Sequence, residues 1–243
     1  MKEVHLILQG KGGVGKSLIA SLIAQFLNET QKNLQCFDTD PVNPTFSRYA
    51  ALNVKIIDLM TPAKTIDSAK FDALIESIIL HEGVTVVDNG AATFVPLVAY
   101  LLESQAIDLL IASGVKIYVH VPIVGGQAKD DTVLNLVNIL KNLACPTVVW
   151  INEFWGAIND DITQWASLKP HKQQIKGIIK LKQLNPDTFG RDISKMTSDA
   201  LLMDQVYKSS DYSLMQKQRI KTFARDIQQQ FNDFYLTEHV ETT

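Results

Sequence analysis

The segment VHLILQGKGGVGKS, residues 4–17, decides the fold of this chain. It opens with an apolar run as long as a buried strand and continues into the pattern G-x-x-x-x-G-K-[ST]. Residues 16–29 then carry apolar side chains at helical spacing. In a glycine-rich loop between a strand and a helix, successive backbone N–H groups turn inward, and the helix N-terminus adds partial positive charge. The segment therefore predicts a phosphate-binding loop.

The rest of the chain repeats this alternation of strand and helix. Apolar runs predict strands at residues 34–37, 84–87, 116–121 and 147–151, with a minor strand at 178–179. Helical spacing predicts helices at 68–80, 96–112, 130–143 and about 211–235, and Gly114 stands where a helix C-cap would. This alternation indicates an α/β fold with a doubly wound, mostly parallel sheet flanked by helices. We expect a single domain spanning 1–243, with helix 211–235 packed on it.

Composition narrows the class of protein. A formal net charge of -3 argues against a surface that is basic all over, so nucleic acid would need a local basic patch. Cys36 and Cys145 are too few for a disulfide framework or a zinc site. The first apolar run is too short for a signal-peptide core, and charged residues interrupt the most apolar region, 95–124. We therefore expect a cytoplasmic protein with no stable membrane insertion.

Polar residues stand where the predicted strands end, which is where ligands bind in such sheets. Lys16 would reach the β- and γ-phosphates of a nucleotide, and Ser17 would ligate magnesium. Asp38 and Asp40 follow the second strand, and Asp88 closes the third as an aspartate that holds a magnesium-bound water would. Aspartates at such positions also cap turns and helices, but their place directly after apolar runs favours function.

An additional lysine, Lys11, sits at the second position of the phosphate loop, and Asp38-Thr39-Asp40-Pro41 follows the second strand. In these features the chain resembles the ParA/MinD family of deviant Walker A P-loop ATPases. The resemblance implies binding of ATP and Mg²⁺, and a nucleotide-sandwich homodimer in which Lys11 touches the phosphates held by the other subunit. It also implies hydrolysis that is slow and stimulated by a protein partner.

The resemblance assigns roles residue by residue. It implies catalytic roles for Lys11, Lys16 and Asp40, with Asp40 positioning the attacking water. It implies that Ser17, Asp38 and Asp88 lie at the metal. It implies nucleotide contacts by the loop, the residue after it and one asparagine: Gly10, Lys11, Gly12, Gly13, Val14, Gly15, Lys16, Ser17, Leu18 and Asn152. From its residue type alone, Asn152 either reads the adenine edge or caps a buried turn.

Two departures from the family pattern bear on the hydrolysis geometry. Asn89-Gly90-Ala91 after Asp88 matches only in part, and the segment after Asp40 is one residue shorter than in ParA proteins. Within the family, residues 8–25 and 38–43 most resemble the plasmid-borne TraL-like proteins of conjugal transfer. The resemblance thus implies a role in conjugal transfer, partition or positioning.

A metabolic P-loop enzyme that uses ATP to activate a small molecule shares this fold and stays open as the alternative. Lys11 favours the dimer switch. An iron-sulfur reductase would need cysteines after the switch regions, where Cys36 and Cys145 do not lie.

The predicted last helix carries an apolar stripe: Ile220, Phe223, Ile227, Phe231 and Phe234. Because residues 228–230 and Asp233 supply no positive charge for lipid, packing on the domain is favoured over membrane binding. Basic residues gather at Lys217, Lys221 and Arg225, and again between Lys169 and Lys182, where Lys172, Lys176 and Lys180 also lie. Either patch could contact DNA non-specifically, although such runs are more often solvated faces.

Overall fold

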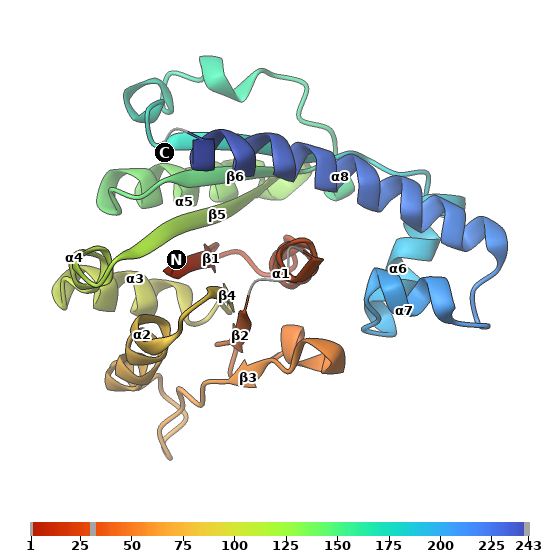
Figure 1. The fold of residues 1–243 in the computed structure, drawn as a ribbon. Coiled ribbons are helices and arrows are strands. Elements are labelled where there is room, and N and C mark those ends of the chain that lie inside the picture. Colours follow the sequence, from red (N-terminus) through yellow and green to blue (C-terminus); the bar gives the residue numbers. More distant parts are fainter. Residues whose placement is uncertain (1, 30–32, 241–243) are drawn as a thin grey trace.

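Seven parallel strands form one sheet in the order β3-β2-β4-β1-β5-β6-β7 (Figure 1). The computed structural model describes residues 2–29 and 33–240, so residues 1, 30–32 and 241–243 of the expected domain lie outside the described part. The strands are β1 Lys2–Ile7, β2 Leu34–Asp38, β3 Lys55–Ile56, β4 Val84–Asp88, β5 Val115–Val124, β6 Thr147–Asn152 and β7 Ile175–Leu181. Every strand pair in the sheet is parallel, which confirms the predicted fold class.

Helices cover both faces of the sheet (Figure 1). They are α1 Lys16–Glu29, α2 Phe71–Leu80, α3 Phe94–Glu103, α4 Ala106–Ala112, α5 Lys129–Asn142, α6 Arg191–Ser198, α7 Met203–Lys208 and α8 Leu214–Val240. One apolar cluster joins the sheet to α1, α6, α7 and α8, and a second joins its other face to α2, α3, α4 and α5. Because both faces are covered, the inner strands read as continuous apolar runs.

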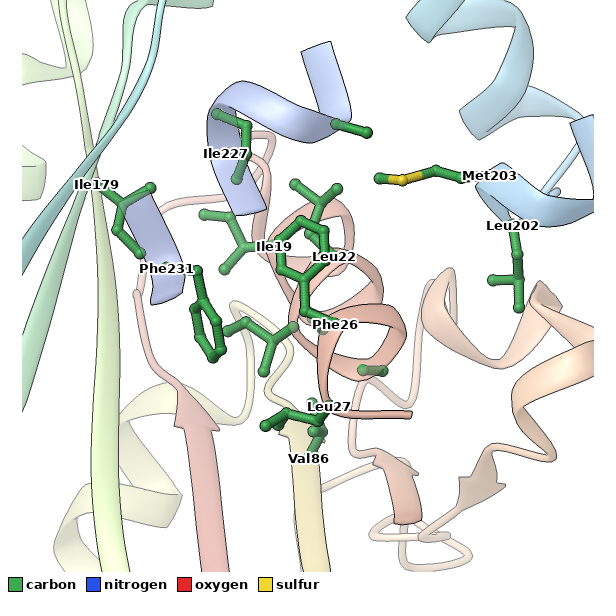
Figure 2. Packing of buried hydrophobic residues seen from close by; sticks show 14 of the residues in the cluster. Ile19, Leu22, Phe26, Leu27, Val86, Ile179, Leu202, Met203, Ile227 and Phe231 are labelled. Atoms are coloured by element: carbon green, nitrogen blue, oxygen red, sulfur yellow. The ribbon is translucent and has the colours of Figure 1, made fainter. Parts of the chain in front are cut away.

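The apolar stripe of α8 packs inward against α1 and the sheet. Ile220, Ile227 and Phe231 are each at most 1% exposed, and Phe223 and Phe234 are buried as well. Figure 2 shows Ile227 and Phe231 of α8 beside Ile19, Leu22 and Phe26 of α1. Burying side chains of this size contributes roughly 1.5–3 kcal/mol each. Removal of this apolar area from water therefore holds α8 in place.

Several predicted boundaries were wrong. The helix expected at 96–112 is two helices, because Gln105 adopts a left-handed conformation (φ 49°) between α3 and α4. The helix expected from residue 68 begins with a 3-10 turn at Ser68–Lys70 and becomes α-helical at Phe71. The minor strand at 178–179 is the seven-residue β7, and β3 was not predicted. Gly114 has φ 76°, as its predicted place at a helix end requires.

In the described part of the chain no single helix has the length and apolar character to cross a membrane. Only the pair α3 and α4, bent by 64° at their junction, meets the length and composition together.

A chain of buried polar side chains crosses the sheet beneath α8, and we call it the buried histidine chain: Glu3, His5, His120, Trp150 and Tyr235. The Trp150 indole donates to His120 Nδ1 (2.9 Å), and His120 Nε2 meets His5 Nδ1 (2.8 Å). His5 Nε2 meets Glu3 Oε1 (2.6 Å), and the Tyr235 hydroxyl donates to Glu3 Oε2 (2.9 Å). Because an indole can only donate, His120 accepts on Nδ1 and donates from Nε2 to His5 Nδ1, which leaves His5 Nε2 as the donor to Glu3. The chain ties α8 to β1.

Candidate functional site

A cleft of about 960 Å³ opens at the carboxyl ends of the strands. Parallel strands all end at this edge, so the loops that follow them converge there. Its walls come from the loops after β1, β2, β4, β6 and β7, together with α6 and one residue of α8. The predicted site residues among its lining are Gly12, Gly13, Gly15, Lys16, Ser17, Leu18, Asp40, Asp88 and Asn152. Gly10, Lys11, Val14 and Asp38 lie outside this lining.

The phosphate loop turns between β1 and α1 through two glycines in left-handed conformations. Gly13 has φ 73° and Gly15 has φ 95°, which other residues rarely adopt. Nothing would obstruct a Cβ on Gly12 or Gly13, whereas one on Gly15 would stand 2.8 Å from the Asn152 amide nitrogen. The loop is therefore open on the cleft side and tightly supported behind.

Lys16 lies at the start of α1 with its ammonium directed back into the loop. Its Nζ donates to the backbone oxygen of Lys11 at 2.9 Å, and the side chain is largely buried. Burial lowers the pKa of Lys16, and the negative charges of Asp88 and Asp40 oppose that shift. A buried ammonium held by a neutral carbonyl is well placed to exchange this contact for an anion.

Ser17 and Asp88 meet at the base of the cleft. The Ser17 hydroxyl donates to Asp88 Oδ2 at 2.5 Å. The other carboxylate oxygen, Oδ1, is buried and has no hydrogen-bond partner. Burial raises the pKa of Asp88 to about 7, despite the hydrogen bond from Ser17 and the charge of Lys16. A buried, unpaired carboxylate oxygen is costly and marks a site for a cation or a proton.

The two carboxylates after β2 have different surroundings. Asp38 is buried, and its two oxygens accept from the backbone N–H groups of Asp40 and Ser47, each at 3.0 Å. Burial raises the pKa of Asp38, and these hydrogen bonds oppose the shift. Asp40 accepts two backbone N–H groups on Oδ1 and lines the cleft. Asp38 thus shapes the loop, while Asp40 faces the cleft.

The residues after β4 form a network that the sequence did not predict. Asn89 is fully buried, and its Oδ1 accepts from the hydroxyls of Thr39 (3.0 Å) and Thr93 (2.8 Å). A Cβ on Gly90 would stand 2.7 Å from the carboxyl carbon of Asp40, so only glycine fits. Asn89-Gly90-Ala91 matches the family pattern only in part, but in this structure these residues hold the loops after β2 and β4 together.

Asn152 has both ends of its amide engaged. Its Nδ2 donates to the backbone oxygen of Val14 (3.0 Å), and its Oδ1 accepts from the backbone N–H of Phe154 (3.1 Å). Of the two alternatives left open by the sequence, this geometry favours the capping role, although Asn152 also lines the cleft.

Lys11 lies at the rim of the loop and is held by an ion pair. Its Nζ stands 2.8 Å from Asp131 Oδ2 on α5, and both side chains are about half exposed (46% and 60%). An exposed pair of this kind contributes about 0–1 kcal/mol, so Lys11 can leave Asp131 at little cost.

Other cleft residues were not predicted from the sequence. Trp155 donates its indole N–H to the backbone oxygen of Gly13 (3.1 Å), and residues 181–184 and Arg191 complete the wall after β7. Only their position in the sequence could have indicated them, because they follow β6 and β7 as the predicted site residues follow the earlier strands.

Comparison with known proteins identifies relatives of this chain. The CobQ/CobB/MinD/ParA nucleotide binding domain matches residues 5–240. A protein TraL from Escherichia coli is 40% identical over 226 residues, covering 91% of this chain and 93% of the relative. A second Escherichia coli protein TraL is 38% identical over 237 residues, covering 96% and 98%. The septum site-determining protein MinD from Pyrococcus horikoshii, solved with Mg-ADP, shares the fold at TM-score 0.53 and 16% identity, covering 93% of this chain and 96% of that one.

Proposed function

Because the chain belongs to the CobQ/CobB/MinD/ParA nucleotide-binding family, we propose that it binds and hydrolyses Mg-ATP, and that ATP switches it to a homodimer. The observation that carries the proposal is the base of the cleft, where Lys16, Ser17 and the unpaired oxygen of Asp88 meet. An ammonium, a hydroxyl and a carboxylate below a glycine loop are the groups that a magnesium-bound triphosphate requires.

In this proposal the phosphate loop and Lys16 bind the phosphates. The Lys16 ammonium leaves the Lys11 carbonyl for the β- and γ-phosphate oxygens, which strengthens its hydrogen bond by adding charge. The loop glycines, with Leu18 beside them, line the cleft around the phosphate chain. Asp40 orients the attacking water, since phosphoryl transfer depends on positioning and charge neutralisation.

The residues at the base of the cleft fit Mg²⁺. Among the described residues no three His, Cys, Asp or Glu side chains come together to hold a metal by themselves. Mg²⁺ does not need such a cluster, because phosphate oxygens and waters supply most of its six ligands. Ser17 and Asp88 would hold the ion or its waters, with Asp38 behind them, and the ion would neutralise phosphate charge.

Lys11 is the proposed link between ATP and dimerisation. In the free chain Asp131 holds its ammonium outside the cleft lining. A γ-phosphate in a second copy carries more charge than one carboxylate and would attract Lys11 away from Asp131. Dimerisation therefore exchanges a weak surface ion pair for a desolvated contact with phosphate.

A metabolic P-loop enzyme remains the second candidate, and the size of the cleft favours it. At about 960 Å³ the cleft is near the upper end of the roughly 300–1,000 Å³ range of ligand sites. It continues from the phosphate loop to Arg191, Ser194 and Thr197, where a second small molecule could bind beside ATP.

We further propose that the switch acts in plasmid conjugal transfer, as the likeness to protein TraL suggests, with a protein partner that stimulates hydrolysis. DNA is a second proposed partner. Among the basic residues, Lys180 pairs with Glu153 and Lys182 with Asp226, whereas Lys217, Lys221 and Arg225 of α8 make no ion pair within the described residues. The α8 group is therefore the better DNA surface.

Sedimentation velocity with no nucleotide, ADP and Mg-ATP tests the switch. We expect the wild type to dimerise only with Mg-ATP, Lys11→Ala to stay monomeric, and Asp40→Ala to stay dimeric longer. Asp131→Ala, which frees Lys11, should dimerise at lower protein concentration. Each dimer breaks two such pairs, one per subunit, so the midpoint should fall by up to about thirtyfold for a pair worth up to about 1 kcal/mol. Asp130→Ala, an exposed neighbour, is the matched control.

If every variant binds ATP as a monomer, the dimer switch is wrong and the small-molecule enzyme becomes the better proposal. Duplex DNA added to the same samples tests the α8 surface. Co-sedimentation should fall steeply with salt and disappear on charge reversal of Lys217, Lys221 and Arg225.

A further inference from the structure

The turn after β6 holds two consecutive peptide groups of the phosphate loop. Trp155 Nε1 donates to the carbonyl oxygen of Gly13 (3.1 Å), and Asn152 Nδ2 donates to the carbonyl oxygen of Val14 (3.0 Å). Both donors lie within four residues of chain, one at the end of β6 and one in the 3-10 turn Glu153–Trp155. The two hydrogen bonds therefore fix adjacent peptide planes of the loop, and both donors belong to the same turn.

Peptide planarity turns these contacts into a constraint on the N–H groups. In a trans peptide the carbonyl of one residue and the N–H of the next point in opposite directions. When Trp155 holds the Gly13 carbonyl, the N–H of Val14 must point to the other side of the loop, and Asn152 fixes the N–H of Gly15 in the same way. Glycines at positive φ lower the cost of rotating these planes, so without such contacts the loop has alternatives.

The turn that presents Trp155 is itself rigid. Gly156 has φ 141°, and a Cβ on Gly125 would stand 2.1 Å from its carbonyl oxygen, so the turn and the end of β5 touch backbone to backbone. The Glu153 carboxylate accepts from the backbone N–H of Ile158 (3.2 Å) and pairs with Lys180 (2.8 Å). Trp155 is 59% exposed, and its ring lies edge-to-face with that of Phe154 (ring centroids 4.8 Å apart), so it is held by this turn, by Phe154 and by its N–H rather than by burial.

We propose that Trp155 is a positioning residue of the phosphate loop, whose indole N–H fixes the Gly13–Val14 peptide so that its N–H faces the polyphosphate chain of the ligand. The proposal rests on the proposed function, because it assumes that the loop binds nucleotide phosphates. Pre-set N–H groups avoid the cost of ordering the loop when an anion binds. The effect acts on phosphate and does not depend on the base.

Titration calorimetry with Mg-ATP and with inorganic tripolyphosphate tests the proposal. Trp155→Phe keeps an aromatic ring and removes only the N–H. We expect its affinity to fall by the same factor for both ligands, roughly three- to tenfold, as for one lost hydrogen bond. Trp165→Phe, the same substitution at a tryptophan outside the cleft lining, is the matched control and should bind both ligands like the wild type.

A second readout separates positioning from general loosening of the fold. Hydrogen exchange at the amides of Val14 and Gly15 should accelerate in nucleotide-free Trp155→Phe, while exchange in α1 and the melting temperature stay at wild-type values. Unchanged tripolyphosphate affinity, or a loss confined to Mg-ATP, would overturn the proposal, since the latter result means a contact with the base. Failure of the wild type to bind either ligand would instead refute the proposed function itself.

Discussion

The base of the cleft and the buried histidine chain are both polar clusters built on one sheet, and they differ in how completely their atoms are paired. In the cleft, Asp88 Oδ1 is buried without a partner, and burial raises the pKa of that carboxyl to about 7. In the histidine chain, both oxygens of Glu3 and both nitrogens of His5 and His120 have partners. In the cleft the unpaired carboxylate oxygen marks a place for a ligand, whereas the paired atoms of the histidine chain hold α8 to the sheet.

The largest effect should come from breaking the paired cluster. Glu3→Ala leaves the His5 N–H and the Tyr235 hydroxyl without their acceptor in the interior. We expect the free energy of unfolding in urea to fall by about 2–6 kcal/mol, because each of the two buried donors left without an acceptor costs roughly 1–3 kcal/mol. The exposed Glu103→Ala is the control. A loss below about 1 kcal/mol would mean that the chain does not hold α8.

In the cleft, removing a polar group should raise the stability of the protein instead of lowering it. Asp88→Asn removes a carboxylate whose charged form is penalised by burial, so the nucleotide-free variant should be more stable than the wild type at pH 8, by on the order of 2 kcal/mol. Because the pKa of Asp88 is higher in the folded state than in the unfolded state, the wild type becomes less stable as pH rises from about 4 to about 7. The stability difference between variant and wild type should therefore be smaller at pH 5 than at pH 8. The variant should also lose stabilisation by Mg-ATP. Thermal melts without and with Mg-ATP measure these two effects. Equal melting curves for the two proteins under all conditions would contradict the comparison.

The smallest effect concerns the pH dependence of the histidine chain. Burial and the neighbouring His5 lower the pKa of His120 well below its usual value, so the folded chain keeps His120 neutral. Below about pH 6.5 His120 binds a proton in the unfolded state but not in the folded state. Its contribution to stability therefore falls as pH falls. We expect His120 to contribute a slope of up to about 1.4 kcal/mol per pH unit between pH 6.5 and 5.5, measured by urea unfolding in the Asp88→Asn background, which lacks the opposite slope of Asp88. His120→Gln in the same background should lose this slope, and an unchanged slope would exclude His120 as its source.

The sheet and the phosphate loop could be predicted because their signals are local. Apolar runs and the loop pattern lie within a few residues, and the parallel sheet follows from their alternation. The break at Gln105 could not be predicted, because no glycine or proline marks the left-handed conformation there and the apolar pattern continues from α3 into α4. β3 was missed because it is two exposed residues, Lys55 and Ile56, with no apolar run.

The site was predicted as a set of strand-end residues, but their partners were not. Lys11 and Asp131 are 120 residues apart, and no local pattern indicates that an exposed lysine will meet an exposed aspartate. His120 looks like a mere interruption of an apolar run until β5 is placed beside β1, where it meets His5. Contacts across the fold depend on register and side-chain direction, which strand and helix patterns do not contain.

The contact between Tyr235 and Glu3 joins residues 232 positions apart, and this has a consequence for the order of events during protein synthesis. At 5–20 residues per second, a ribosome that has made β1 needs roughly ten to fifty seconds to make the partner that completes the burial of Glu3. Throughout that time the central strand carries a carboxylate that lacks its last hydrogen-bond donor, the Tyr235 hydroxyl. We therefore expect the nascent chain to reach its native core only after α8 has emerged from the ribosome.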